Sequence, residues 1–166
     1  MTFNELKKLS KKPVNGGIKL KAALLGDTAT QFMAAALKGT AVKFGFDLEL
    51  FEADFNQVEN LLSSQNSALN EFGADFIIVY QSSRKLLEKH LRLDFNSQKN
   101  LAEERVKFLK TACENFPKQK IICLNYLEID DGIFGSYANK VEASFINQVR
   151  KLNLSLAKLA QETPNF

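Results

Sequence analysis

The sequence is poor in the side chains that build metal sites and disulfide frameworks. It has one histidine, His90, and two cysteines, Cys113 and Cys123, among 166 residues. The cysteines stand ten positions apart and form no Cys-x-x-Cys pair, so their spacing indicates neither a zinc site nor a disulfide. We therefore expect no metal, and a reducing compartment, the cytoplasm, as the location.

Long apolar runs and a strong charge of one sign are also missing. No stretch approaches the roughly 20 apolar residues of a membrane-spanning helix, and the amino terminus lacks the apolar core of a signal peptide. The net charge is only +3, and the lysines near the amino terminus are interpreted as a solvated face. These absences predict a soluble protein with neither a membrane nor a nucleic-acid partner.

What the sequence does contain is a regular alternation of short β-rich runs and helix-length segments, which is typical of βαβ units. The length of 166 residues suits one well-cored domain, spanning residues 1–166. Because parallel strands need right-handed crossovers, the pattern predicts an α/β fold, a three-layer α/β/α sandwich with a mainly parallel sheet in the order 2-1-3-4. The four predicted strands are Leu20–Leu25, Leu48–Phe51, Phe76–Tyr80 and Ile121–Asn125.

Helical spacing of apolar residues fills the segments between these strands. A final helix is predicted from the stripe Phe145, Val149, Leu152, Leu156 and Leu159, and Pro164 follows it in the manner of a residue that introduces another strand. We therefore expect the chain to be an amino-terminal fragment of a longer, multidomain protein. The other predicted helices are Phe3–Leu9, Gln31–Phe44 with a stop at Gly45, Asn56–Phe72 with a break in its middle, and Leu86–Phe116 divided at Asp94–Asn96.

Polar residues follow each predicted strand, and in a parallel sheet these strand ends meet at one edge, where ligands collect. The sharpest break is Gly26-Asp27-Thr28, directly after an apolar run. The candidate site therefore consists of Asp27 and Thr28 as catalytic candidates, with Gly26, Asp54, Asn56, Gln57, Ser82 and Asn125 as substrate-binding candidates.

Several of these candidate residues have an ordinary structural explanation as well. Thr28 is either a nucleophile or the first residue of a Thr-x-x-Gln capping box with Gln31. Asp27 could orient a base, bind a cation or serve as a helix cap, and Asp54 could merely complement a helix dipole. A hydroxyl nucleophile needs a base, and His90, late in its helix, is predicted to be a surface residue remote from the strand ends.

Two further polar stretches have the same ordinary readings. Ser82 and Ser83 are interpreted as helix caps, and Asp130-Asp131-Gly132 as a solvated turn. No Gly-x-Gly-x-x-Gly, Walker or Gly-x-Ser-x-Gly motif occurs.

The Gly26-Asp27-Thr28 block resembles the first block of the SGNH (GDSL-like) hydrolases, whose Gly-Asp-Ser supplies the nucleophile. Three separated segments together look like the amino-terminal domain of FkbH-like proteins: residues 25–32, 52–57 and 134–140. The resemblance covers most of the chain and implies a flavodoxin-like or SGNH-like fold. It also implies a downstream phosphatase domain of the haloacid dehalogenase superfamily and loading of a glyceryl unit, from a phosphorylated three-carbon acid, onto an acyl carrier protein.

The sequence departs from the SGNH pattern at several positions. Thr28 replaces the serine, and Gln81-Ser82-Ser83 stands where active enzymes carry their glycine and asparagine donors. The closing Asp-x-x-His and the Asp-x-Asp signature of the phosphatase are both missing from the chain. Since losing a general base costs about 10² to 10⁴ in rate, we expect this chain alone to be nearly inert as an esterase.

The resemblance thus implies an SGNH-like domain that serves acyl or glyceryl transfer to an acyl carrier protein, and we expect no cofactor. A second reading makes it a non-catalytic docking module for the carrier protein or for the phosphatase domain. A third compares residues 27–30 with the hydroxyl-rich phosphate loop of flavodoxins, which a colourless purified protein would exclude.

Overall fold

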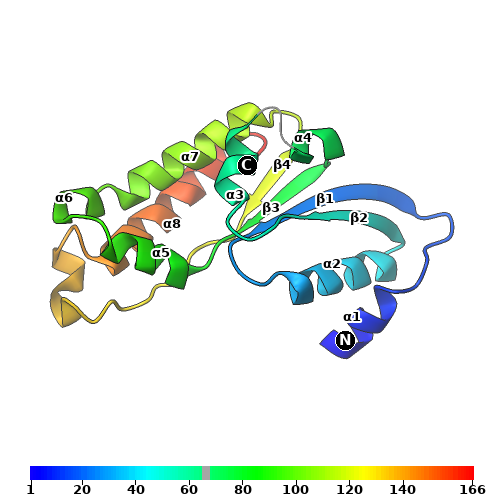
Figure 1. Cartoon of the computed structure of the whole chain (residues 1–166), viewed down its shortest axis with the longest axis horizontal. Helices are drawn as coiled ribbons and strands as arrows, with labels where there is room; N and C mark the ends of the chain where they lie inside the picture. The colour runs from blue at the N-terminus through cyan, green and yellow to red at the C-terminus, as the bar shows by residue number, and fades with distance from the viewer. Residues whose placement is uncertain (65–67) are drawn as a thin grey trace. The chain divides into compact units, whose positions relative to one another are not determined.

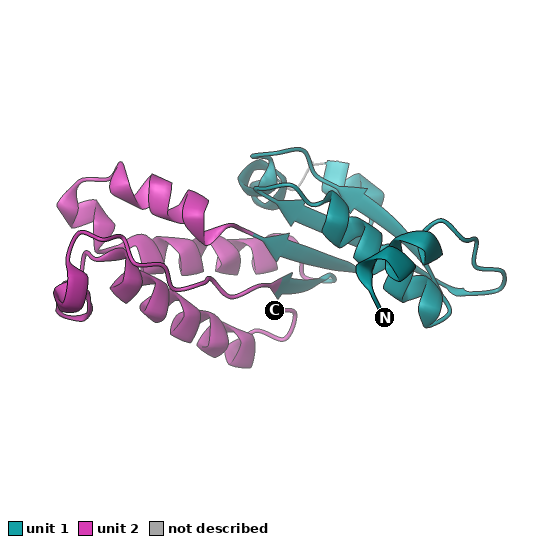
Figure 2. Cartoon of the chain, turned by 90° about the horizontal axis from the view of Figure 1, so that it is seen from below, with its two compact units in different colours: residues 1–80, 118–122 teal, residues 81–117, 123–166 magenta. Residues whose placement is uncertain are grey.

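The structure, a computed structural model, describes residues 1–64 and 68–166 of the chain. These residues form two compact units. The first unit contains residues 1–80 and 118–122, and the second contains residues 81–117 and 123–166 (Figure 2). Each unit has a hydrophobic cluster built from its own residues.

A four-stranded sheet with the order β2-β1-β3-β4 forms the centre of the first unit. The central strand β1 pairs in parallel with both β2 and β3. The predicted α/β class, the parallel sheet and the order 2-1-3-4 are therefore confirmed. The strands are β1 (Ile18–Gly26), β2 (Phe46–Glu52), β3 (Phe76–Tyr80) and β4 (Lys120–Cys123), the last residue of which belongs to the second unit.

Helices cover both faces of this sheet, as the right-handed crossovers require (Figure 1). On one face Leu24 and Ile78 are buried in a cluster with Ala34 of α2. On the other face the ring of Phe51 lies 5.5 Å from that of Phe72 in α4. The layering of a three-layer sandwich is thus present. The helices of this unit are α1 (Phe3–Leu9), α2 (Gln31–Lys43), α3 (Val58–Ser63) and α4 (Ala68–Phe72).

The ends of these helices follow local chemistry. Helix α2 stops at Gly45, as predicted, because this residue has a φ of 79°, which favours glycine. The predicted helix Asn56–Phe72 is two short helices, α3 and α4. Residues 65–67 of the predicted break lie outside the described residues.

Helix α1 has no buried residue of its own and is held by its packing on α2 at Gly39. A Cβ at Gly39 would lie 2.7 Å from the carbonyl carbon of Leu6 and would overlap its oxygen. The Gly39→Ala variant is therefore expected to release α1 from α2, although alanine favours the helical state of α2 by about 1 kcal/mol.

Limited proteolysis and amide exchange of residues 3–9 measure this release. The matched control is Thr40→Ala, at the exposed neighbouring position, and it should leave protection of α1 unchanged. Unchanged protection in Gly39→Ala would contradict the tight contact.

The second unit is helical. Its helix α8 buries Phe145, Val149, Leu152, Leu156 and Leu159, which confirms the stripe predicted from the sequence. This stripe packs in one cluster with Leu101 and Leu109 of α7. The helices are α5 (Ser83–Leu91), α6 (Phe95–Gln98), α7 (Leu101–Asn115), the 3-10 helix η1 (Gly135–Lys140) and α8 (Phe145–Glu162). Among the described residues, no helix combines the length and apolar character needed to cross a bilayer.

The fourth strand ends two residues earlier than predicted, at Cys123 rather than at Asn125. Beyond its end the chain is held by Asn153 of α8. The amide of Asn153 donates to the carbonyl oxygen of Tyr126 at 2.8 Å, and its side-chain oxygen accepts from the N–H of Tyr126 at 2.9 Å. The backbone of Tyr126 is thus paired with a helix side chain.

Candidate functional site

The end of β1 makes a tight turn that presents Asp27 and Thr28. A Cβ at Gly26 would overlap the methyl group of Thr30, so only glycine fits there without a shift. The N–H of Asp27 donates to the carbonyl oxygen of Tyr80 at 3.3 Å, which holds the turn against β3. Both Asp27 and Thr28 are half-buried, so their side chains lie at the surface of the sheet edge.

The end of β2 forms the neighbouring turn. The N–H of Ala53 donates to the carbonyl oxygen of Leu24 at 3.2 Å, so β2 stays attached to β1 just past its last residue. The N–H of Gln57 then donates to the carbonyl oxygen of Asp54, also at 3.2 Å, and closes a turn. Within it Asn56 has a φ of 64°, a left-handed conformation that asparagine tolerates better than most residues.

These two turns share one edge of the sheet because β1 and β2 are adjacent and parallel. The buried Thr30 links them, since its hydroxyl donates to a carboxylate oxygen of Glu52 at 3.5 Å. The structure therefore brings six of the predicted site residues to one edge of the first unit. They are Gly26, Asp27, Thr28, Asp54, Asn56 and Gln57, of which the last three are exposed.

The other two predicted site residues, Ser82 and Asn125, belong to the second unit. Ser82 occupies the N-cap position of α5, with extended backbone and no side-chain capping hydrogen bond. Asn125 is exposed, two residues beyond the end of β4. Ser83, read as a cap from the sequence, instead accepts the N–H of Leu127 on its hydroxyl at 2.7 Å.

The capping box predicted at Thr28 is wrong. Helix α2 begins at Gln31, and its N-cap residue is Thr30, whose side chain makes no capping hydrogen bond. In a capping box the threonine is the N-cap residue and the glutamine is the third residue of the helix. Thr28 lies two residues before the N-cap, and Gln31 is the first residue of the helix, so the two do not form this box. Helix capping therefore no longer explains the threonine.

The prediction that His90 is a surface residue is also wrong. Its side chain is 1% exposed, and its ring centroid lies 5.4 Å from that of Phe145. Nε2 lies 2.9 Å from the carbonyl oxygen of Ala143, which can only accept, so Nε2 carries the proton. Burial lowers the pKa of His90, although the bond to Ala143 and the charge of Asp131 both raise it. The imidazole is thus a neutral group of the core.

No histidine is present in the unit that holds Thr28, because His90 is the single histidine of the chain and belongs to the second unit. The thiols do not supply a reactive group either. Desolvation raises the pKa of Cys113 and of Cys123 to about 11, so both stay protonated at neutral pH. The described residues contain no group of three or more metal-ligating side chains.

The acidic stretch at residues 130–132 folds as a turn, in agreement with the sequence interpretation. A carboxylate oxygen of Asp130 accepts the N–H of Gly132 at 2.9 Å. Asp131 accepts the N–H of Ile133 at 3.0 Å and that of Phe145 at 3.1 Å. Both carboxylates are therefore occupied by backbone donors.

The second unit contains a buried polar cluster that was not predicted from the sequence. Arg105, 9% exposed, donates to the side-chain oxygen of Gln81 and, at 3.3 Å, to the hydroxyl of Tyr126. That hydroxyl donates to the same oxygen of Gln81 at 2.9 Å. The signal was the position of Arg105 on the apolar stripe of α7, four residues after Leu101 and four before Leu109. A charged residue on such a stripe indicates a buried polar contact.

The chain matches a protein family and is similar to solved structures. Residues 21–166 match the family described as FkbH, N-terminal domain. The whole chain is similar to a crystal structure of the N-terminal part of the protein BF1531 from Bacteroides fragilis, described as containing a phosphatase domain and complexed with Mg. The two are 43% identical, with a TM-score of 0.96, and the present chain covers 44% of that longer chain. A search of curated proteins gives no match.

Proposed function

The chain belongs to the family of FkbH N-terminal domains, and on that premise we propose that it takes part in acyl or glyceryl transfer to an acyl carrier protein. In this proposal the transfer involves a phosphatase-type domain of the same polypeptide. The similar protein from Bacteroides fragilis supports that arrangement, since its structure is described as containing a phosphatase domain and this chain covers only 44% of it.

Within that reaction we assign this domain a binding role. The observation that carries the assignment is the edge formed by the ends of β1 and β2, which presents Asp27, Thr28 and Asp54 in a unit without a histidine. A hydroxyl without a base is a poor nucleophile at neutral pH. Hydroxyl, carboxylate and amide groups together are suited to hydrogen bonding the hydroxyl groups of a glyceryl unit.

The SGNH-like character of the domain is part of the same proposal. The Gly26-Asp27-Thr28 turn stands at the end of the first strand of a parallel sheet, where an SGNH hydrolase would hold its nucleophile. In this proposal Thr28 keeps the position of that nucleophile, and its hydroxyl contributes to binding.

The test is a transfer assay with the full-length gene product, an acyl carrier protein and a phosphorylated three-carbon acid, comparing Thr28→Ala and Thr28→Ser with wild type. A binding role predicts that Thr28→Ala lowers kcat by less than about tenfold and acts mainly on KM. Thr28→Ser, which keeps the hydroxyl, should behave like wild type. A loss of about 10³-fold or more in kcat for Thr28→Ala, with activity retained in Thr28→Ser, would make Thr28 a nucleophile instead.

A docking module without any part in the reaction is the second candidate. It is favoured by the same lack of a histidine in the unit that holds Thr28. The two candidates separate in the assay above, because a pure docking role predicts that Thr28→Ala changes neither kcat nor KM for the three-carbon acid.

A further inference from the structure

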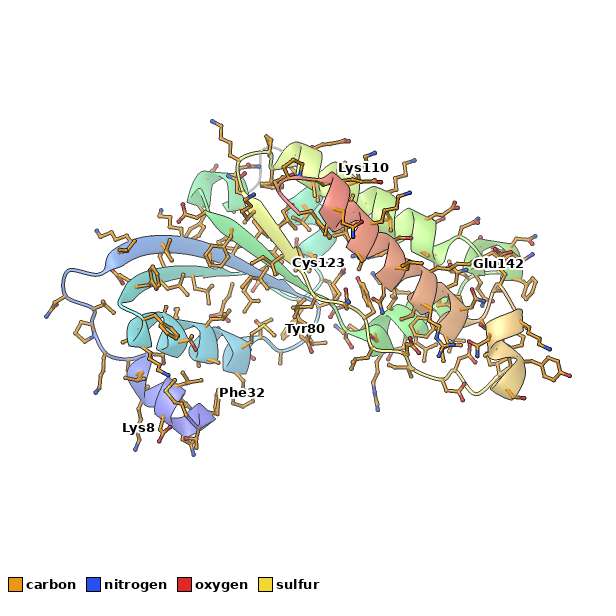
Figure 3. All side chains as sticks on the ribbon, turned by 180° about the vertical axis from the view of Figure 1, so that it is seen from behind. Lys8, Phe32, Tyr80, Lys110, Cys123 and Glu142 are labelled. Atoms are coloured by element: carbon orange, nitrogen blue, oxygen red, sulfur yellow. The ribbon has the colours of Figure 1, made fainter. Side chains whose placement is uncertain are left out.

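A groove runs between α7 and α8 in the second unit, and the site described above does not use it. It has a volume of about 540 Å³ and lies against Ala102, Val106, Lys107, Lys110, Lys151 and Leu154. A smaller hollow of about 260 Å³ continues from it along α8 and shares Lys151 and Leu154. Figure 3 labels Lys110 on α7, where this helix runs beside α8.

The apolar residues that line the groove include surface that the core does not bury. Leu154 is 74% exposed and lies outside the buried stripe of α8, between Leu152 and Leu156, which both face the core. Val106 of α7 is half-buried at the margin of the core cluster. An exposed leucine beside such a margin provides apolar surface that a partner can cover.

The rim of the groove is basic. Lys107 and Lys110 stand three residues apart on α7 and form no ion pair with any described residue. Lys151 on α8 contacts Glu142 at 2.7 Å, but this pair is exposed on both sides and so contributes little. Against these three lysines the groove has one carboxylate, that of Glu103. Apart from the half-buried Ser155, its polar side chains are long and exposed, which suits a charged protein surface better than a small molecule.

We propose that this groove, lined by Val106, Lys107, Lys110, Lys151 and Leu154, docks an acidic helix of the acyl carrier protein. The fitting helix carries an apolar side chain that covers Leu154 and Val106, with carboxylates on either side that face the lysines. The inference rests on the proposed function for the identity of the partner. Charge complementarity of this kind sets the association rate and the orientation of the partner.

The experiment is a titration of the chain with unacylated acyl carrier protein, followed by calorimetry or fluorescence anisotropy. Lys107→Glu/Lys110→Glu should weaken binding by about tenfold or more, and Lys107→Gln/Lys110→Gln by a smaller factor. Leu154→Ala should weaken it several-fold without a change in the salt dependence. The matched control is Lys7→Glu/Lys8→Glu, which makes the same change of net charge at two exposed positions of α1. It should bind as wild type does.

The outcomes separate this surface from the proposed function. Equal binding by wild type, groove variants and control would overturn the docking surface and leave the transfer proposal standing. No binding by wild type would also overturn it, while the transfer assay decides the function independently. Circular dichroism of every variant shows whether the fold is retained, and Leu154→Ala provides a second test that leaves the charges of α7 in place.

Discussion

The His90→Ala variant is expected to lose about 2–4 kcal/mol of unfolding free energy near neutral pH. Two costs add. Removing the ring leaves a cavity beside Phe145, which packs against it at 5.4 Å between centroids. It also leaves the carbonyl oxygen of Ala143 without the Nε2–H donor that now lies 2.9 Å away. Urea unfolding measures the loss, and Leu91→Ala, at an exposed neighbouring position, serves as the control and should change stability by less than about 0.5 kcal/mol.

The difference in unfolding free energy between His90→Ala and wild type should become smaller as the pH falls. Burial lowers the pKa of His90 below 6.5 in the folded state. Above about pH 6.5 the imidazole is neutral in both states and makes no pH-dependent contribution. Below it, the unfolded chain binds a proton that the folded chain does not, so wild-type stability declines as the pH falls from 6.5 towards the lowered pKa. Since the chain has one histidine, the decline between about pH 6.5 and 5 should be much weaker in His90→Ala. A difference that stays constant across this range would contradict a neutral buried imidazole.

The sheet could be predicted from the sequence because its determinants are local. Apolar runs such as Phe76–Tyr80 are long enough to identify a strand, and the helix-length segments between them require crossovers that leave few topologies. Even the end of α2 follows from a single residue, Gly45, and its left-handed backbone. The β1 end of the candidate site follows in the same way, since the turn at Gly26 directly continues a predicted strand.

The predictions that the structure contradicts concern residues whose contact partners are remote in sequence. His90 is buried by residues about 53 positions away, at Ala143 and beyond, and no local pattern contains that contact. The chain after the fourth strand is held by Asn153, 27 positions after Tyr126, and no local pattern contains that contact either. Thr28 fits a capping motif in sequence, but in the structure Thr30, two residues later and close to Gly26, is the N-cap residue of α2. In each case tertiary contacts overrode a local preference that was real but weak.

Gln148 shows the same principle and supports the second large prediction. Its side chain is fully buried, although it lies on the apolar stripe of α8. Its oxygen accepts the N–H of Ala102 at 3.0 Å, and its nitrogen donates to the carbonyl oxygen of Glu142 at 2.8 Å. Ala102 is the second residue of α7, where backbone N–H groups have no partner within the helix. Gln148 therefore caps α7 from α8 and also holds the segment that leads into α8.

The Gln148→Leu variant is expected to lose about 2–4 kcal/mol of unfolding free energy, despite its greater hydrophobicity and similar size. Leucine fills the space but leaves the N–H of Ala102 and the carbonyl of Glu142 without their partners. Gln161→Leu, the same substitution at an exposed position of the same helix, should change stability by less than about 0.5 kcal/mol. Amide exchange at Ala102 should accelerate in Gln148→Leu beyond the change seen elsewhere in α7, which a general loss of packing would not produce.

The Gln148→Glu variant tests whether the loss comes from the hydrogen bonds themselves. Its carboxylate can still accept the N–H of Ala102, but it faces the carbonyl of Glu142 without a proton and places a charge in the core. Burial raises the pKa of such a carboxyl above its value in the unfolded chain. Its protonated form is then favoured in the folded state, so the deficit relative to wild type should be largest at neutral pH and should shrink as the pH falls through the raised pKa. Below the raised pKa the protonated carboxyl can again donate to the carbonyl of Glu142. Recovery of nearly wild-type stability there would support the hydrogen bonds as the source of the loss, and a deficit that persists below the raised pKa would contradict it.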